Sequence, residues 1–206
     1  GSGPNGAIVH YRAIAGADRE LASDDLLLLD SGGHYRDGTT DITRTIAIGT
    51  PPKGAVAAYS HVLQSHIHLA VAKFPEGTNG KQLDAIARAP LWAAGLDFAH
   101  GTGHGVGHVL SVHEGPASIS KRGDVALEAG MVLSNEPGYY QTGDWGIRIE
   151  NLIVVTPVKQ TGFLEFETIT LCPLDRRLID KTRLDAGEID WINRYHRAVY
   201  EQLHPH

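Results

Sequence analysis

Four acidic residues interrupt apolar segments of this 206-residue chain where strands are expected. Asp30 ends an apolar run, Asp41 starts an alternating Thr/Ile segment, Glu136 precedes a Pro-Gly pair and Glu150 follows an isoleucine. A carboxylate at such a place costs free energy unless it is hydrogen-bonded, paired or bound to a metal. One strand-end acid alone most often accepts backbone hydrogen bonds, so the set of four is what favours chemistry.

The second chemical signal is a dense group of histidines. Of the 12 histidines in the chain, four fall within fourteen positions, and glycines separate them at 101, 103, 105 and 107. Each glycine disfavours a helix by roughly 1 kcal/mol relative to alanine, so this segment is predicted to be non-helical. The four histidines are His100, His104, His108 and His113.

Gathering four ionised carboxylates in one core would raise their pKa values strongly and destabilise the fold. Two divalent cations would balance four negative charges, and oxygen-rich ligands with one imidazole suit Mn²⁺, Co²⁺ or Zn²⁺. A pair of such ions about 3.5–4 Å apart is a common hydrolytic centre. The sequence has no cysteine pair, HExxH or P-loop motif that would indicate another site. These residue types therefore predict a two-metal hydrolytic site.

The elements that must position these residues follow from periodicity and turn signals. We expect one α+β domain over residues 1–206, with a central sheet and helices outside it. After a Gly/Pro-rich start, a strand is predicted at 7–14, and segments 26–30 and 40–48 are predicted to form a β-hairpin. Helices are predicted at 55–74, at 81–94 with a kink or restart at Pro90, and in the terminal region 186–206. Strands are predicted between 131 and 171.

Composition excludes several classes of function. Lys plus Arg is 18 and Asp plus Glu is 24, giving a net charge of −6 with no basic cluster, which argues against a nucleic-acid or acidic-membrane partner. No apolar run approaches the ~20 residues that span a bilayer, and the first residues show no signal-peptide pattern. Cys172 is the single cysteine, so no intrachain disulfide can form and a cytoplasmic location is expected.

Five separated motifs, in order along the chain, resemble those of the pita-bread metallopeptidases. Two further segments, Gly6-Ala7-Ile8-Val9-His10-Tyr11 and His113-Glu114-Gly115-Pro116, are similar to the aminopeptidase P branch, the Xaa-Pro aminopeptidases. The motifs are Asp30-Ser31-Gly32-Gly33, Asp41-Ile42-Thr43-Arg44-Thr45, His100-Gly101-Thr102-Gly103-His104-Gly105-Val106-Gly107, Asn135-Glu136-Pro137-Gly138-Tyr139-Tyr140 and Arg148-Ile149-Glu150-Asn151.

The resemblance implies a pita-bread fold, a curved antiparallel sheet with outer helices, and a metallopeptidase that removes an amino-terminal residue preceding proline. It implies that Asp30 binds one metal ion, that His104 and Glu136 bind the other, and that Asp41 and Glu150 bridge both. Carboxylates can bridge through two oxygens, whereas imidazole supplies one neutral donor.

The same resemblance assigns roles around the metals. Glu136 would accept or relay the proton of the attacking water, and His100 and His113 would act in catalysis and in binding the proline-containing substrate. The substrate-binding set is His10, His100, His113, Tyr140 and Arg148. Two alternatives stay open: His10 could be an ordinary strand histidine, and Arg148 could be only a charge partner of Glu150.

Other histidines receive no role in the metal site. His108 has no assignable function and is expected to pack in the core or lie at the surface. His61, His66 and His68 lie on one predicted helix, where a packed or solvated face is expected.

Among the metals, Mn²⁺ is the leading expectation, with Co²⁺ or Zn²⁺ as alternatives, and a homodimer is expected from the resemblance. Because the family's catalytic domain begins with helices upstream of the strand containing His10, this chain is expected to lack its first helices. The nearest rival function is a prolidase or another pita-bread exopeptidase. A rival of another class is a noncatalytic binding module that keeps the fold without its metals.

Overall fold

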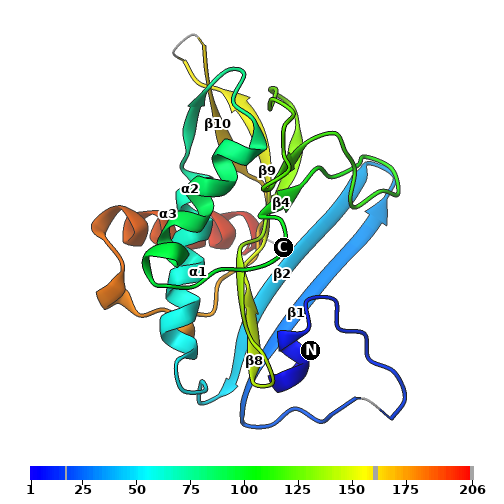
Figure 1. Ribbon diagram of the computed structural model, residues 1–206, viewed down its shortest axis with the longest axis vertical. Helices are drawn as coiled ribbons and strands as arrows, with labels where there is room; N and C mark the ends of the chain where they lie inside the picture. The colour runs from blue at the N-terminus through cyan, green and yellow to red at the C-terminus, as the bar shows by residue number, and fades with distance from the viewer. Residues whose placement is uncertain (17, 160–161, 205–206) are drawn as a thin grey trace.

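The computed structural model describes residues 1–16, 18–159 and 162–204. Within them a long hairpin and several antiparallel sheets are flanked by three α-helices (Figure 1), which confirms the expected α+β fold. In chain order the elements are η1 (Gly3–Ala7), β1 (Asp24–Tyr35), β2 (Gly38–Gly49), α1 (Ala55–Ala70), β3 (Lys73–Pro75), α2 (Gly80–Ala93), β4 (Gly103–His104), β5 (Ser118–Ile119), β6 (Val132–Asn135), β7 (Gly138–Gln141), β8 (Trp145–Arg148), β9 (Asn151–Pro157), β10 (Phe163–Thr168), η2 (Arg176–Leu178), η3 (Lys181–Arg183) and α3 (Ala186–Leu203).

The predicted hairpin is confirmed and is longer than expected. Strands β1 and β2 pair antiparallel along their whole length, from Asp24 opposite Gly49 to Tyr35 opposite Gly38. Alternation places Leu26 and Leu28 in the interior while Leu29 is half exposed, as the two-residue period of a strand requires. The hairpin thus has one covered face and one open face.

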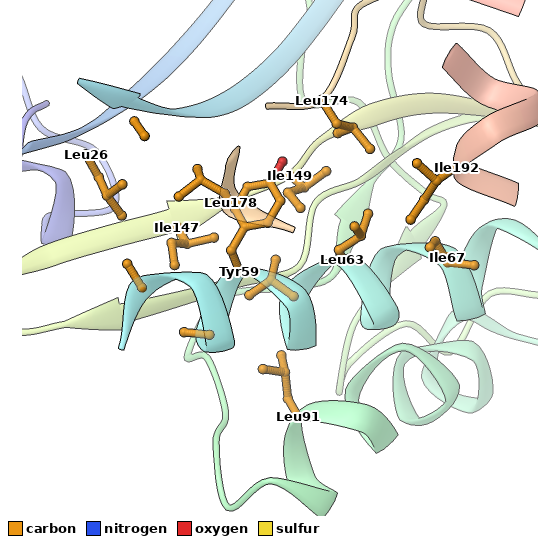
Figure 2. Packing of buried hydrophobic residues seen from close by; sticks show 14 of the residues in the cluster. Leu26, Tyr59, Leu63, Ile67, Leu91, Ile147, Ile149, Leu174, Leu178 and Ile192 are labelled. Carbon is orange, nitrogen blue, oxygen red and sulfur yellow. The ribbon is translucent and has the colours of Figure 1, made fainter. Parts of the chain in front are cut away.

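Helix α1 is the centre of the main hydrophobic core. Tyr59, Leu63 and Ile67, one turn apart on the same face, pack against Ile147 and Ile149 of the β8 region (Figure 2). Residues at positions i, i+4 and i+8 form the apolar stripe that an amphipathic helix buries. The α3 helix closes the other side of this cluster with Trp191, Ile192, Tyr195 and Val199.

Both predicted helices that follow the hairpin are present, with different ends. Residues 73–75 are not helical, because they form β3, which pairs with β10; the predicted helix over 55–74 therefore ends at Ala70. Helix α2 starts with a capping box between Asn79 and Gln82 and continues through Pro90 rather than restarting there.

The remaining strands form small antiparallel sheets. Strands β3, β10, β9 and β6 lie side by side in that order, while β4 pairs with β5 and β7 pairs with β8. An isolated bridge between Gly105 and Leu133 ties the glycine-rich segment to β6. The strands expected between 131 and 171 are therefore confirmed.

The strand predicted at 7–14 is wrong. Residues 3–7 form a 3-10 helix and residues 8–14 run as a turn and irregular chain. The preceding residues are anchored edge-on to the hairpin, because the Gly1 ammonium donates to the Leu28 carbonyl and Ser2 bridges Leu27. These contacts, which the local sequence does not reveal, hold the preceding residues against β1, and His10 lies in a turn. Among the described residues, no helix is long and apolar enough to cross a membrane.

Candidate metal centre

The five predicted metal ligands come from five separate places in the chain and converge on one cavity. Donor atoms in each of three overlapping groups lie within 4.8 Å of one another, and Glu150 belongs to two of the groups. The groups are Asp30–Asp41–Glu150, His104–Glu136–Glu150 and Asp41–His104–His113. Asp41, Glu150 and His104 each belong to two of these groups, so the three groups form one continuous cluster of possible metal ligands.

The hairpin positions the two aspartates. Asp30 of β1 is directly opposite Thr43 of β2, and Asp41 lies two residues before Thr43, so the three side chains share one face. Asp41 is 11% exposed at its side chain, whereas Asp30 is 44% exposed and accepts a hydrogen bond of 2.6 Å from Arg148 Nη2. Asp30 thus lies at the mouth of the site and Asp41 deeper inside.

His104 presents a single nitrogen to the acids. Its Nδ1 lies 3.0 Å from the Gly105 carbonyl and takes the role of donor, which leaves Nε2 3.3 Å from Glu136 Oε1 and 3.5 Å from Asp41 Oδ2. Burial of the ring opposes its charge, but Asp41, the Gly105 carbonyl and Glu136 together raise the pKa of His104 to about 9. The same Nε2 is the atom that a metal ion would take from the neutral ring.

The two glutamates are held in an environment that opposes their negative charge. Burial raises the pKa of Glu136 to about 7, although His104 and Arg148 act in the other direction. Burial, followed by the charges of Glu136 and Asp41, raises the pKa of Glu150 to about 8. Such crowding of carboxylates is relieved by divalent cations, so the donor set fits a pair of oxygen-preferring metal ions.

Two hydrogen bonds with Thr43, one from its hydroxyl and one to its main chain, fix the position of Glu150. Thr43 donates from Oγ1 to Glu150 Oε2 at 2.6 Å, and the Thr43 carbonyl accepts from the Glu150 amide at 3.1 Å. The sequence analysis names Thr43 only as part of the motif that begins with Asp41. Its place two residues after Asp41, on the same face of a strand, was the available signal for its role, because a fully buried hydroxyl beside a predicted ligand must find a partner.

A hydrogen-bond chain connects His100 to the acids. His100 Nε2 lies 2.8 Å from the Tyr140 hydroxyl, which accepts from Arg148 Nη1 at 2.9 Å. Arg148 also donates from Nε to Thr43 and from Nη2 to Asp30. Burial lowers the pKa of His100 to about 4, so its ring is neutral. Its Nε2 therefore accepts a hydrogen bond from the Tyr140 hydroxyl. The charge partner of Arg148 is therefore Asp30 and not Glu150. Its ion pair with a glutamate is the longer one to Glu136 Oε2, at 3.9 Å.

His113 and His10 lie on the open side of the cavity. The rings of His113 and His104 are 3.9 Å apart between centroids, while His108, on the same loop, is exposed and outside the cavity. The cavity has a volume of about 270 Å³. Its lining consists of Val9, His10, Asp30, Asp41, His100, Gly101, Gly103, His104, His113, Glu136, Arg148 and Glu150.

The glycines of the histidine segment allow backbones to approach closely. A Cβ on Gly103 would lie 1.9 Å from the Ser134 carbonyl oxygen, and one on Gly105 would lie 2.1 Å from the Glu114 carbonyl oxygen. No side chain can occupy such space, so these glycines let His104 reach the acids next to β6.

Arg88, which the sequence analysis did not single out, holds the segment that carries His100. This fully buried guanidinium donates to the carbonyls of Phe98 and His100 and to the carboxylates of Asp84 and Asp97.

A larger hollow of about 780 Å³ lies between α3 and the η2–η3 segment, but its one acid, Asp175, is already bonded to Arg177. The carboxylate–histidine cavity is therefore the better candidate for chemistry.

Comparison with known proteins agrees with this geometry. Residues 1–157 match the family model of metallopeptidase family M24, and residues 162–206 match the model of the C-terminal region of peptidase M24. A probable Xaa-Pro aminopeptidase P of Coprinopsis cinerea is 48% identical over 99% of this chain, and aminopeptidase P1 of Lotus japonicus is 48% identical over 99%. The chain covers 34% and 32% of these two proteins, so it spans about a third of their length.

Solved structures show the same relationship. The X-prolyl aminopeptidase of Caenorhabditis elegans, described as a cytosolic enzyme with a di-nuclear active site, superposes with a TM-score of 0.95 at 44% identity. That match covers 100% of this chain and 34% of the other. The prolidase of Pyrococcus furiosus reaches a TM-score of 0.71 at 33% identity, covering 81% of this chain and 46% of the other. The expected pita-bread fold is confirmed, and the chain belongs to metallopeptidase family M24.

Proposed function

We propose that residues 1–206 form a single catalytic domain of a two-metal aminopeptidase that releases an amino-terminal residue preceding proline. The observation that carries the proposal is the convergence of four carboxylates and one imidazole, from five places in the chain, on one cavity. Relatives named Xaa-Pro aminopeptidase, at 46–48% identity over nearly the whole chain, support the substrate class.

Asp30, Asp41, His104, Glu136 and Glu150 would hold two divalent ions. Bound there, the ions would supply charge and lower the pKa of a shared water toward roughly 7, which makes a nucleophile available at neutral pH. Mn²⁺ is our proposed metal, because hard carboxylate oxygens dominate the ligand set, and Co²⁺ and Zn²⁺ are the alternatives.

The protein's own residues would bind the peptide, orient the reacting groups and accept the proton of the water. Glu136, which lies in the cavity 3.3 Å from His104 Nε2, would accept the proton of the attacking water at its carboxylate. His113 and His10, on the open side of the cavity, contact the peptide and its proline. His100, Tyr140 and Arg148 form one bonded chain that shapes the inner wall and orients Asp30.

The substrates of the proposed enzyme are peptides with proline at the second position, and we propose a cytoplasmic homodimer. The location is supported by the description of the Caenorhabditis elegans relative as cytosolic. Analytical ultracentrifugation of the purified protein measures the oligomeric state, and a monomer at micromolar concentration would contradict the dimer.

A pair of substrates separates the proposal from its rivals. Purified protein loaded with Mn²⁺ is expected to cleave an Xaa-Pro-Xaa tripeptide and to leave an Xaa-Pro dipeptide intact. Preference for the dipeptide would establish the prolidase instead, a rival kept open by structural likeness to prolidases. A folded protein that binds no divalent ion and cleaves neither peptide would be the noncatalytic module.

A further inference from the structure

A buried polar cluster lies behind the proposed metal ligands, on the side facing α1 and α3. His66, Asn135 and Asn151 are fully buried, and Arg44 and Tyr195 are nearly so. Asn135 and Asn151 are direct partners in the β6–β9 ladder. Asn135 immediately precedes Glu136 and Asn151 immediately follows Glu150. Neighbouring residues of an extended chain point to opposite faces, so each asparagine faces the core while the adjacent glutamate faces the cavity.

The orientation of the Asn151 amide is determined by its partners. Its Oδ1 accepts from Arg44 Nη2 at 2.7 Å and from the Tyr195 hydroxyl at 3.2 Å. Its Nδ2 therefore points to the third partner, His66 Nε2, at 3.1 Å. Because Nδ2 can only donate, His66 Nε2 accepts and the ring is neutral. Burial and the charge of Arg44 lower the pKa of His66 to about 3, in agreement with that role.

The same cluster also forms hydrogen bonds with the backbone at and near Glu150. Arg44 Nη1 donates to the Glu150 carbonyl at 2.6 Å and to the Thr43 carbonyl at 2.9 Å. The backbone carbonyl of His66 accepts from Asn135 Nδ2 at 2.9 Å. One turn of α1 thus contacts the strand beside each glutamate. A side-chain substitution at 66 deletes the hydrogen bond to Asn151 and the edge contact with the Trp191 ring, whereas the bond from Asn135 to the His66 carbonyl can remain.

We propose that His66 is a positioning residue, which through Asn151 and Arg44 fixes the place of Glu150 as a ligand shared by two divalent ions. This inference rests on the proposed two-metal function. The imidazole holds the core side of Asn151, and Thr43 holds the carboxylate on the cavity side. Removing the acceptor leaves a buried amide without a partner, and the amide or its strand must shift to find one. Glu150, one residue away, shifts with it.

The test compares three variants of the metal-free protein by titration with Co²⁺, following bound cobalt by calorimetry and its visible absorption spectrum. His66→Leu removes the acceptor, and His66→Gln keeps an acceptor oxygen on a flexible side chain. Leu63→Ala is the matched control, because Leu63 is fully buried on the same helix and belongs to the adjoining hydrophobic core. Circular dichroism establishes that each variant is folded before titration.

For His66→Leu we expect Co²⁺ affinity to fall about 10- to 100-fold, the usual effect of removing a group that orients a metal ligand, together with an altered spectrum. His66→Gln is expected to restore most of the affinity and the wild-type spectrum. Leu63→Ala is expected to lower the melting temperature while keeping both. Wild-type affinity and spectrum in His66→Leu would overturn the inference, as would an equal loss in Leu63→Ala.

A milder variant covers the case in which His66→Leu does not fold. Tyr195→Phe deletes a hydroxyl that lies 3.2 Å from Asn151 Oδ1, accepts from Arg44 Nη2 at 2.9 Å and also bonds backbone groups of Thr170 and Cys172. Because this change loosens both Arg44 and Asn151, it is expected to weaken Co²⁺ binding and change the spectrum relative to Leu63→Ala. Unchanged binding in Tyr195→Phe would then overturn the inference. Failure of the proposed function is recognised separately, because in that case the wild-type protein itself binds no cobalt.

Discussion

Replacing Gly103 by alanine tests whether close backbone contact sets the metal site. A Cβ at position 103 would lie 1.9 Å from the Ser134 carbonyl oxygen, whereas contacts under 3.0 Å are essentially never seen. The two backbones must therefore separate by at least 3.0 − 1.9 = 1.1 Å. His104, the next residue, has its Nε2 only 3.3 Å from Glu136 Oε1, so the separation moves the imidazole relative to the acids.

The size of the effect follows from packing and from metal geometry. Overpacking of this kind costs about 1–3 kcal/mol of unfolding free energy. For a chain of about 200 residues, each kcal/mol lowers the melting temperature by about 2–4 °C, so we expect a decrease of about 2–12 °C. Metal sites tolerate ligand displacements of only about 0.2 Å, so a shift near 1 Å is expected to abolish tight binding by His104.

Gly101→Ala is the matched control, two residues earlier in the same segment. A Cβ there meets the Ser120 Cβ at 3.3 Å as its nearest atom, a contact that a shift of a few tenths of an ångström relieves. Thermal unfolding by circular dichroism and Co²⁺ titration are measured for both variants. Equal melting temperatures and equal Co²⁺ affinities in the two variants would refute the reasoning.

Three further predictions concern the acids and the buried arginine. Asp41→Ala should reduce bound metal and abolish peptidase activity, because it removes a carboxylate that we propose as a ligand of both ions; elemental analysis showing wild-type metal content would contradict the assignment. Arg88→Met should lower the unfolding free energy by about 3–5 kcal/mol in urea denaturation, since it leaves the Asp84 carboxylate buried without its 2.8 Å partner. A loss no larger than that of an exposed substitution would show that the pair contributes little. The metal-free protein should become less stable as pH rises from about 6.5 toward 8. Folded Glu136, Glu150 and His104, with pKa values of about 7, 8 and 9, hold protons that the unfolded chain releases at lower pH. Below about 6.5 their effect is offset by His66 and His100, whose folded pKa values of about 3 and 4 keep them neutral while unfolded histidines are protonated. Thermal unfolding across this range checks the slope, which bound metal should flatten and which a pH-independent metal-free protein would disprove.

The sequence alone determined the chemical content of the site. Carboxylates that interrupt apolar strands, and histidines separated by glycines, predicted an oxygen-rich metal centre before any contact was known. Period-two alternation predicted the β1–β2 hairpin, and helical spacing predicted α1, α2 and α3. These features are local, because strand and helix periods and turn residues act over a few positions.

Other outcomes were decided by contacts between distant residues. The strand-like segment 7–14 did not form a strand, because the preceding residues bond to β1 at Leu27 and Leu28. Helix α1 ended at Ala70 because β10 offers residues 73–75 a pairing partner.

The contacts behind the proposed metal ligands could not be predicted from the sequence either. His66 looked like any helix histidine, yet it bonds Asn151, which is 85 residues away. Arg44 reaches Glu150 across 106 residues. A buried donor or acceptor must find a partner, but which partner it finds depends on how the hairpin, α1 and β9 pack together. The sequence therefore specified which groups gather in the proposed metal centre, and only tertiary packing decided which groups hold them in place.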